Sequence, residues 1–273
     1  MKINCGLIVS DFDSTLIDDR QRILPEVKGA IEQYVACGGI FAVCTGRMLN
    51  SILPQVRALG LKGLVIAYQG TVIADIETGE LIRNGGMNFE EASEICRTIE
   101  ELGYGINVYN DNIIYTDLPE EHKGLVRYEE IIGVKAVHVK DKISDFVFEN
   151  KLRCQKVLSI VSPDSREEVY AQLSERLGKK YDITCSATVL VEVSPMGDNK
   201  GEALKFLANY YNVPIEKTVA IGDNLNDLPM IIAAGTGCAV GNAVKELKDA
   251  ADFISVSNNE GAVAQIIKKF GFV

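Results

Sequence analysis

The sequence lacks the features of several protein classes. It contains no tryptophan and only 2 histidines among 273 residues, and its 28 Lys and Arg are outnumbered by 38 Asp and Glu. A net charge of −10 argues against a nucleic-acid-binding protein, because such proteins displace counterions with a basic surface. An acidic protein can still bind an anion where a metal ion or a few basic groups gather. We therefore expect no nucleic-acid partner.

Long apolar runs are missing as well. The longest stretch without a charge, Leu228–Val244, is shorter than the roughly 20 residues that span a bilayer. The apolar run Ile3–Val9 is too short, and meets Asp11 too soon, to be a signal peptide. The 7 cysteines include no C-x-x-C pair, which is typical of reduced thiols packed as small apolar groups. We expect no membrane partner and a cytoplasmic location, while the oligomeric state leaves no mark in the sequence.

What is present is the composition of an ordinary globular protein, with 47% hydrophobic and 24% charged residues. At both ends of the chain, short runs that are apolar throughout alternate with amphipathic helical segments. This alternation predicts a parallel sheet covered by helices on both faces. Its strands are expected at Cys5–Ser10, Ile40–Cys44, Leu64–Ala67, Val189–Val193, Thr218–Ile221, Cys238–Val240 and Phe253–Ser255.

The middle of the chain has a different pattern. It is more charged, with helical segments at Glu90–Leu102 and Arg166–Leu177 and paired strands around Asn110–Asn112. The predicted fold class is therefore α/β: a Rossmann-like, doubly wound, mostly parallel sheet core interrupted by an inserted α+β domain. We place the core at residues 1–83 and 188–273 and the inserted domain at residues 84–187.

Polar side chains follow four of the predicted core strands. In an open parallel sheet, ligands bind beyond the carboxyl ends of the strands, so these side chains are expected to meet in one crevice. The residues concerned are Asp11-Phe12-Asp13-Ser14-Thr15 after the first strand, Thr45-Gly46-Arg47 after the second, Lys200-Gly201 beyond Val189–Val193, and Gly222–Asp227 after Thr218–Ile221.

Several carboxylates at such a crevice repel one another unless a cation lies among them. Asp11, Asp13 and Asp223 are hard oxygen ligands without a neighbouring His or Cys, which favours Mg²⁺ over zinc. A substrate phosphate would fill the open metal positions. Lys200, the Thr45 hydroxyl and the backbone amides after Asp11 would bind its oxygens. The predicted phosphate-binding residues are Ser14, Thr45, Gly46 and Lys200. Such a site is suited to phosphoryl transfer.

The spacing of Asp11 and Asp13 suggests two roles. Asp11 can attack phosphorus and form an aspartyl-phosphate. Asp13 can donate a proton to the leaving oxygen and later accept one from the attacking water. The substrate is expected to be a small phosphorylated metabolite, such as a sugar phosphate.

These motifs, in this order, resemble the four motifs of the haloacid dehalogenase superfamily. The chain is similar in particular to the Cof-like phosphatases, whose large α/β cap is inserted after the third core strand. Ala239–Ala243 and Ser257–Glu260 fit their C-terminal patterns. The resemblance implies that Asp11 is the nucleophile and Asp13 the acid and base. It also implies that Mg²⁺ is bound by the Asp11 carboxylate, the Asp13 carbonyl and Asp223, with Asn226 and Asp227 in support.

Two residues depart from the family pattern. Ser14 stands where glycine is usual, which is acceptable for a negative φ. Gln69 stands where this subfamily usually has Asn, so its contact with substrate is open. Arg47 is either a surface arginine or a residue that faces the substrate. The cluster Asp18-Asp19-Arg20 is expected to be a solvated flap.

Three functions remain to be distinguished. The favoured one is a Mg²⁺-dependent phosphatase, a phosphoric monoester hydrolase. The second is a phosphomutase on the same scaffold, which would isomerise a hexose phosphate without net release of phosphate. The third is a sensor that binds a phosphorylated metabolite without turnover. The inserted domain, which would select the substrate, contains no motif that identifies it.

Overall fold

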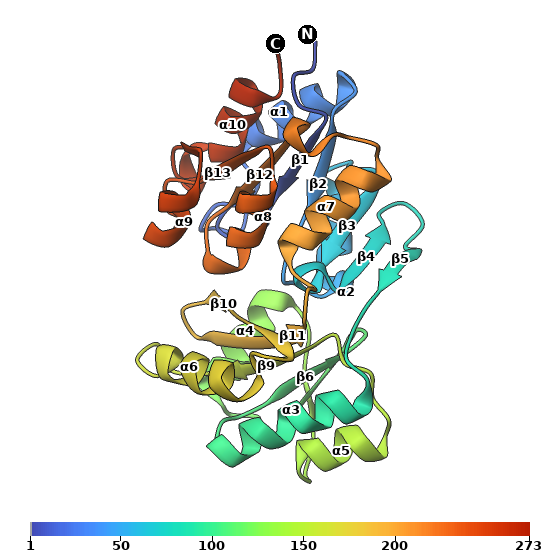
Figure 1. Ribbon diagram of the computed structural model, residues 1–273, viewed down its shortest axis with the longest axis vertical. Helices are drawn as coiled ribbons and strands as arrows, with labels where there is room; N and C mark the ends of the chain where they lie inside the picture. The colour runs from blue at the N-terminus through green and yellow to red at the C-terminus, as the bar shows by residue number, and fades with distance from the viewer. Residues whose placement is uncertain (1) are drawn as a thin grey trace. The chain divides into compact units, whose positions relative to one another are not determined.

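The computed structural model describes residues 2–273, with the backbone alone at 186 and 187 (Figure 1). The chain forms two compact units. The first consists of the chain up to Gly46 together with Leu53–Ile82 and Asn199–Val273, and the second consists of Arg47–Ile52 and Arg83–Asp198.

The first unit is built on a parallel sheet, as predicted. Five strands pair in the order β14-β13-β12-β1-β2, and every pair is parallel. A single parallel bridge between Cys44 and Ile66 connects this sheet to an antiparallel sheet of the order β3-β4-β5. The strands are β1 (Leu7–Ser10), β2 (Ile40–Val43), β3 (Leu64–Ala67), β4 (Val72–Asp75), β12 (Thr218–Gly222), β13 (Thr236–Ala239), β14 (Phe253–Ile254) and β5 (Leu81–Asn84), whose last two residues belong to the second unit.

The helices of the first unit begin and end where the sequence signals lie. α1 (Pro25–Ala36) has its proline at the first helical position, where a missing N–H costs nothing. It packs against α10 (Ala262–Phe270), while α7 (Lys200–Tyr210) packs against α8 (Leu228–Ala233). The α/β fold class predicted from the sequence is confirmed. The remaining helices are α2 (Leu49–Ala58), whose first turn belongs to the second unit, and α9 (Lys245–Ala250).

The second unit is a six-stranded, largely antiparallel sheet in the order β10-β11-β9-β6-β7-β8. Alternate strand residues such as Val108, Val157 and Val191 enter one apolar core with Ile95 and Leu173 from two helices. The elements are α3 (Phe89–Leu102), β6 (Asn107–Asn110), β7 (Ile113–Thr116), α4 (Lys123–Ile132), β8 (Val137–His138), α5 (Ile143–Glu149), β9 (Lys156–Ile160), α6 (Arg166–Leu177), β10 (Tyr181–Ala187) and β11 (Leu190–Pro195).

One predicted core strand is wrong. The run Val189–Val193 was expected in the parallel sheet, but β11 pairs antiparallel with β9 and β10 in the second unit. Its residues Val191 and Val193 belong to the apolar core of that unit. An apolar run does not reveal which of two sheets it joins. The second unit therefore extends to Asp198, beyond the expected boundary at residue 187.

A buried ion pair crosses the sheet of the second unit. Lys156 on β9 donates to Glu192 on β11 over 3.2 Å, and the two side chains are only 2% and 3% exposed. The Lys156 ammonium also lies 4.7 Å from the ring centre of Tyr109. Burial works against the charge of Lys156, but Glu192 outweighs it, so the pKa of the lysine is raised.

This pair gives a test of the second unit's packing. Glu192→Gln preserves the shape of the side chain but removes the carboxylate charge that pairs with the buried Lys156 ammonium. We expect the free energy of unfolding, measured in urea, to fall by about 3 kcal/mol or more. Combining Lys156→Met with Glu192→Leu should recover most of this loss, because it removes both charges. A double variant as unstable as Glu192→Gln would contradict the account.

Candidate active site

The site begins where β1 and β12 end. These strands are parallel neighbours with Ser10 opposite Ile221, so Asp11 and Asp223 leave the sheet side by side. The Asp11 amide donates to the Ile221 carbonyl over 2.9 Å, which continues the ladder past the strand end. Parallel pairing is thus the reason that two acids far apart in the sequence meet.

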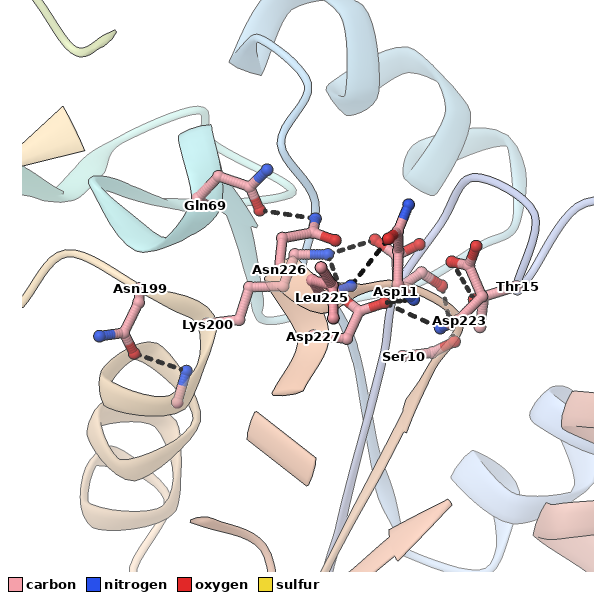
Figure 2. A network of polar contacts seen from close by, with 12 residues as sticks. Ser10, Asp11, Thr15, Gln69, Asn199, Lys200, Asp223, Leu225, Asn226 and Asp227 are labelled. Atoms are coloured by element: carbon pink, nitrogen blue, oxygen red, sulfur yellow. Dashed lines mark hydrogen bonds and ion pairs between the residues drawn. The ribbon is translucent and has the colours of Figure 1, made fainter. Parts of the chain in front are cut away.

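Lys200 joins these acids from the first position of α7, although no core strand precedes it. The Asn199 side chain caps this helix through the amides of Gly201 and Glu202. The Lys200 side chain is completely buried, and its Nζ donates to Asp11 Oδ1 at 2.5 Å and to Asp227 Oδ1 at 2.6 Å. Figure 2 shows the ammonium between the two carboxylates.

Asp227 also organises the turn that carries Asp223. Its Oδ2 accepts from the Asp223 amide over 2.8 Å (Figure 2). The same oxygen accepts from the Asn224 amide over 3.1 Å. The Thr15 hydroxyl donates to Asp223 Oδ1 over 3.0 Å. The loop after β1 is therefore connected to the loop after β12 by a side-chain hydrogen bond.

The charges of this cluster are unbalanced. Desolvation raises the pKa of Asp11 well above its ordinary value, against the opposing effect of Lys200. Desolvation, together with the charge of Asp227, raises the pKa of Asp223 to about 7. The pKa of Lys200 is raised, because Asp11 and Asp227 outweigh the desolvation that opposes its charge. Three carboxylates facing one ammonium leave an excess of negative charge.

The donor set fits a hard divalent cation. Among the described residues, Asp11, Asp223 and Asp227 each offer a carboxylate oxygen, and these oxygens lie within 4.8 Å of one another. Oxygen donors without His or Cys suit Mg²⁺. The predicted ligand set consists of the Asp11 carboxylate, the Asp13 backbone carbonyl and Asp223, with Asp227 in support. Asp13 is half-buried in the loop after β1, and its charge is among the influences that raise the pKa of Asp11.

Gln69 contacts both the loop after β2 and the loop after β12. Thr45 is buried, its amide bonds to the Ile66 carbonyl, and its carbonyl accepts from the Gln69 amide. A Cβ at Gly46 would lie 2.5 Å from Gln69 Nε2, so any larger residue there would displace the Gln69 side chain. Gln69 is buried and accepts from Asn226 Nδ2 over 3.1 Å. The structure therefore brings Thr45, Gly46, Gln69 and Asn226 together.

Two findings concern backbone and exposure. Ser14 has a φ of +55°, so it does not meet the condition of a negative φ under which serine was acceptable in place of glycine. Asp18 is 4% exposed and accepts from the Arg22 side chain at 3.0 and 2.7 Å, so this part of the cluster is not a solvated flap. Arg47 is buried and belongs to the second unit.

In the described part of the chain, no helix is both long and apolar enough to cross a membrane.

Comparison with known proteins identifies the family. The model of the haloacid dehalogenase-like hydrolases matches residues 8–267, and the chain belongs to this family. The phosphatase YwpJ of Bacillus subtilis is 30% identical over 285 residues, which cover 96% of this chain and 98% of YwpJ. The 5-amino-6-(5-phospho-D-ribitylamino)uracil phosphatase YcsE, also of B. subtilis, is 28% identical, with coverage of 97% and 96%.

A solved structure agrees with this assignment. A haloacid dehalogenase-like hydrolase from B. subtilis has a TM-score of 0.85 to this chain at 28% identity, with coverage of 96% of this chain and 99% of that one. The family predicted from the motifs is confirmed, as is the enzyme class, a phosphatase-type hydrolase.

The raised pKa of Asp223 predicts how the metal-free protein responds to pH. The folded state binds this proton more tightly than the unfolded chain, so the stability it contributes is complete below about pH 4 and lost as the pH rises toward 7. Asp223→Asn cannot ionise but still accepts from Thr15. In EDTA we expect it to be more stable than the wild type above pH 7, by about 2 kcal/mol, and the difference to shrink toward pH 4.

Thermal unfolding between pH 4 and pH 8 measures this difference. MgCl₂ should stabilise the wild type at pH 8 and leave Asp223→Asn almost unchanged, since the variant lacks a ligand. A variant that is less stable than the wild type at pH 8 in EDTA would show that ionisation of Asp223 does not oppose folding.

Proposed function

We propose that this protein is a Mg²⁺-dependent phosphatase that hydrolyses small phosphorylated metabolites, such as sugar phosphates, through an aspartyl-phosphate on Asp11. The observation that carries the proposal is the buried Lys200 ammonium between Asp11 and Asp227, beside Asp223. The relatives named above support it, because both are called phosphatases and one is named for a phosphorylated small molecule.

Asp11 is the proposed nucleophile. One of its carboxylate oxygens attacks phosphorus, the bond from phosphorus to the ester oxygen breaks, and Asp13 protonates the leaving alcohol. Asp13 then takes a proton from a water molecule that attacks the same phosphorus. The phosphorus–Asp11 bond breaks, inorganic phosphate leaves, and the Asp11 carboxylate is restored with Asp13 protonated again.

Lys200 and Asp227 prepare this nucleophile. The ammonium stabilises the ionised form of Asp11, which desolvation opposes, and lies where phosphate oxygens would arrive. Asp227 holds Lys200 in place and fixes the turn of Asp223. Because the Lys200 amine is fully buried, it needs no reorganisation when charge develops on the phosphate.

The remaining polar groups are assigned by their places in the site. Mg²⁺ would be held by Asp11, the Asp13 carbonyl and Asp223, with Asn226 and Asp227 in support, and when bound it would neutralise charge on the phosphate oxygens. Ser14, Thr45 and Gly46, with Lys200, are the proposed phosphate-binding residues. Gln69 and Arg47 are proposed to face the substrate.

The second unit is proposed to be a cap that selects the substrate, because the catalytic groups named above belong to the first unit. Its sequence carries no substrate motif, so the substrate must be found by experiment. The free cysteines of the described chain fit a reducing, cytoplasmic location.

Asp11→Asn tests the nucleophile. We expect this variant to lose Mg²⁺-dependent hydrolysis of p-nitrophenyl phosphate by about a thousandfold or more, because an amide cannot form the covalent intermediate. Asp249→Asn is the matched control, since Asp249 is an exposed residue of α9 that pairs with Lys245. Acid quench during turnover of ³²P-labelled substrate should leave label on the peptide that contains Asp11. Full activity of Asp11→Asn would refute the assignment.

A screen of phosphorylated metabolites with Mg²⁺ separates the three functions. Release of phosphate, with kcat/KM differing among sugar phosphates, nucleotides and cofactor phosphates, supports the phosphatase. Isomerisation of a hexose phosphate without phosphate release would indicate a mutase. Thermal stabilisation by a phosphate ester without turnover would indicate a sensor.

A further inference from the structure

Two asparagines outside the four motifs contact the loop that carries Asp13. Asn242 lies in the turn after β13, and Asn258 begins the short 3₁₀ turn Asn258–Glu260 after β14. Asn242 Nδ2 donates to the Ser14 carbonyl over 2.8 Å. Asn258 Nδ2 donates to the Ile17 carbonyl over 3.0 Å. The two residues therefore bind backbone carbonyls on both sides of Thr15.

The asparagines are also joined to each other. The Asn258 amide donates to Asn242 Oδ1 over 2.9 Å. Asn258 is only 3% exposed and donates a further bond to Asp19 Oδ1 over 3.2 Å. A continuous set of hydrogen bonds thus runs from Ser14 through Asn242 and Asn258 to Ile17. We refer to it as the asparagine bridge.

The turn that carries Asn242 is fixed against the loop of Asp223 as well. The Val244 amide donates to the Asp223 carbonyl over 2.9 Å, and the Val240 amide donates to the Gly222 carbonyl over 3.1 Å. Gly241 approaches the next loop so closely that a Cβ would lie 2.8 Å from the Ser257 amide nitrogen. One turn therefore contacts both loops that supply acids to the site.

The conformation of Ser14 explains why this support matters. Its φ of +55° lies in the left-handed region, which a serine occupies at a cost of about 1–2 kcal/mol. A hydrogen bond to the Ser14 carbonyl stabilises that conformation from outside the loop. Since Ser14 directly follows Asp13, the same bond holds the backbone next to the residue that carries the proposed general acid.

We propose that Asn242 and Asn258 are positioning residues that hold Asp13 where it can protonate the leaving oxygen. This inference rests on the proposed function, in which Asp13 is the general acid. Without the asparagine bridge the loop after β1 can change its conformation. We expect this change to slow proton donation to the leaving group more than any other step. Substrates with a poor leaving group, such as alkyl phosphates, need that proton, whereas p-nitrophenyl phosphate has a good leaving group and needs it far less.

The experiment compares these two kinds of substrate. kcat/KM includes the steps up to the first phosphoryl transfer, so it reports leaving-group protonation even where a later step limits kcat. For Asn242→Ala with Mg²⁺ we expect kcat/KM to fall about tenfold or more on the alkyl phosphate that the wild type hydrolyses fastest, and less than about threefold on p-nitrophenyl phosphate. Asn242 is exposed, so this variant should fold.

Two further variants complete the test. Asn258→Ala should show the same preference for the aryl ester, even if its buried position lowers its thermal stability. Asn259→Ala is the control: Asn259 is exposed and contacts the more distant Asp19. We expect it to change both kcat/KM values by less than about twofold.

The outcomes separate the inference from the proposed function. An equal loss on both substrates in Asn242→Ala and Asn258→Ala would mean that the bridge serves folding alone, and would overturn the inference while leaving the phosphatase intact. A wild-type protein that releases no phosphate from any ester would overturn the proposed function itself. A selective loss on alkyl phosphates, absent in Asn259→Ala, supports the positioning role.

Discussion

The site depends on one interaction, the buried ammonium of Lys200 shared between Asp11 and Asp227. Burying three charges costs more than their mutual attraction returns unless the geometry is close and the remaining lone pairs are bonded. Asp227 meets this condition through two backbone amides, whereas Asp11 and Asp223 remain partly uncompensated, with raised pKa values. The first unit thus maintains a local excess of negative charge that opposes folding in the metal-free state and favours a bound cation.

The loops around these charges are held by strand pairing and by hydrogen bonds between loops. Parallel pairing of β1 with β12 places Asp11 beside Asp223, and the loop after β1 is hydrogen-bonded to the loop after β12 and to the turn after β13. Tyr68, Gln69 and Gly70 all have positive φ, so the chain after β3 turns sharply and brings Gln69 against Gly46. Such conformations persist only where surrounding contacts determine them, and here those contacts are made by the site itself.

Much of the first unit could be predicted, because β1, β2 and β12 are apolar runs followed at once by residues of the candidate site. The limits of prediction are equally physical. The run at Val189–Val193 has the composition of a core strand, and only its pairing with Lys156 and its neighbours places it in the second unit. Asp227 is predicted only as a supporting residue, because its bonds to two amides and to Lys200 depend on a turn whose shape the sequence does not reveal. Ser14 likewise has a positive φ and accepts a hydrogen bond from Asn242, 228 residues away, which its own segment does not reveal.

The helices α3 and α6 and the β6–β7 pair of the second unit lie where they were predicted, but the polar residues of its sheet could not be predicted, for a related reason. A catalytic acid beyond a strand end is recognised from its own segment, but a buried polar group on a sheet face is meaningful only with the residue opposite. Lys156 and Glu192 lie on neighbouring strands, and Tyr109 and Tyr128, whose hydroxyls are 2.6 Å apart, come from a third strand and a helix. Their arrangement exists only after strand register is set. Residues that distinguish one substrate from another would therefore leave little trace in a single sequence if they lie on such a face, even where the motifs of the chemistry are easily read.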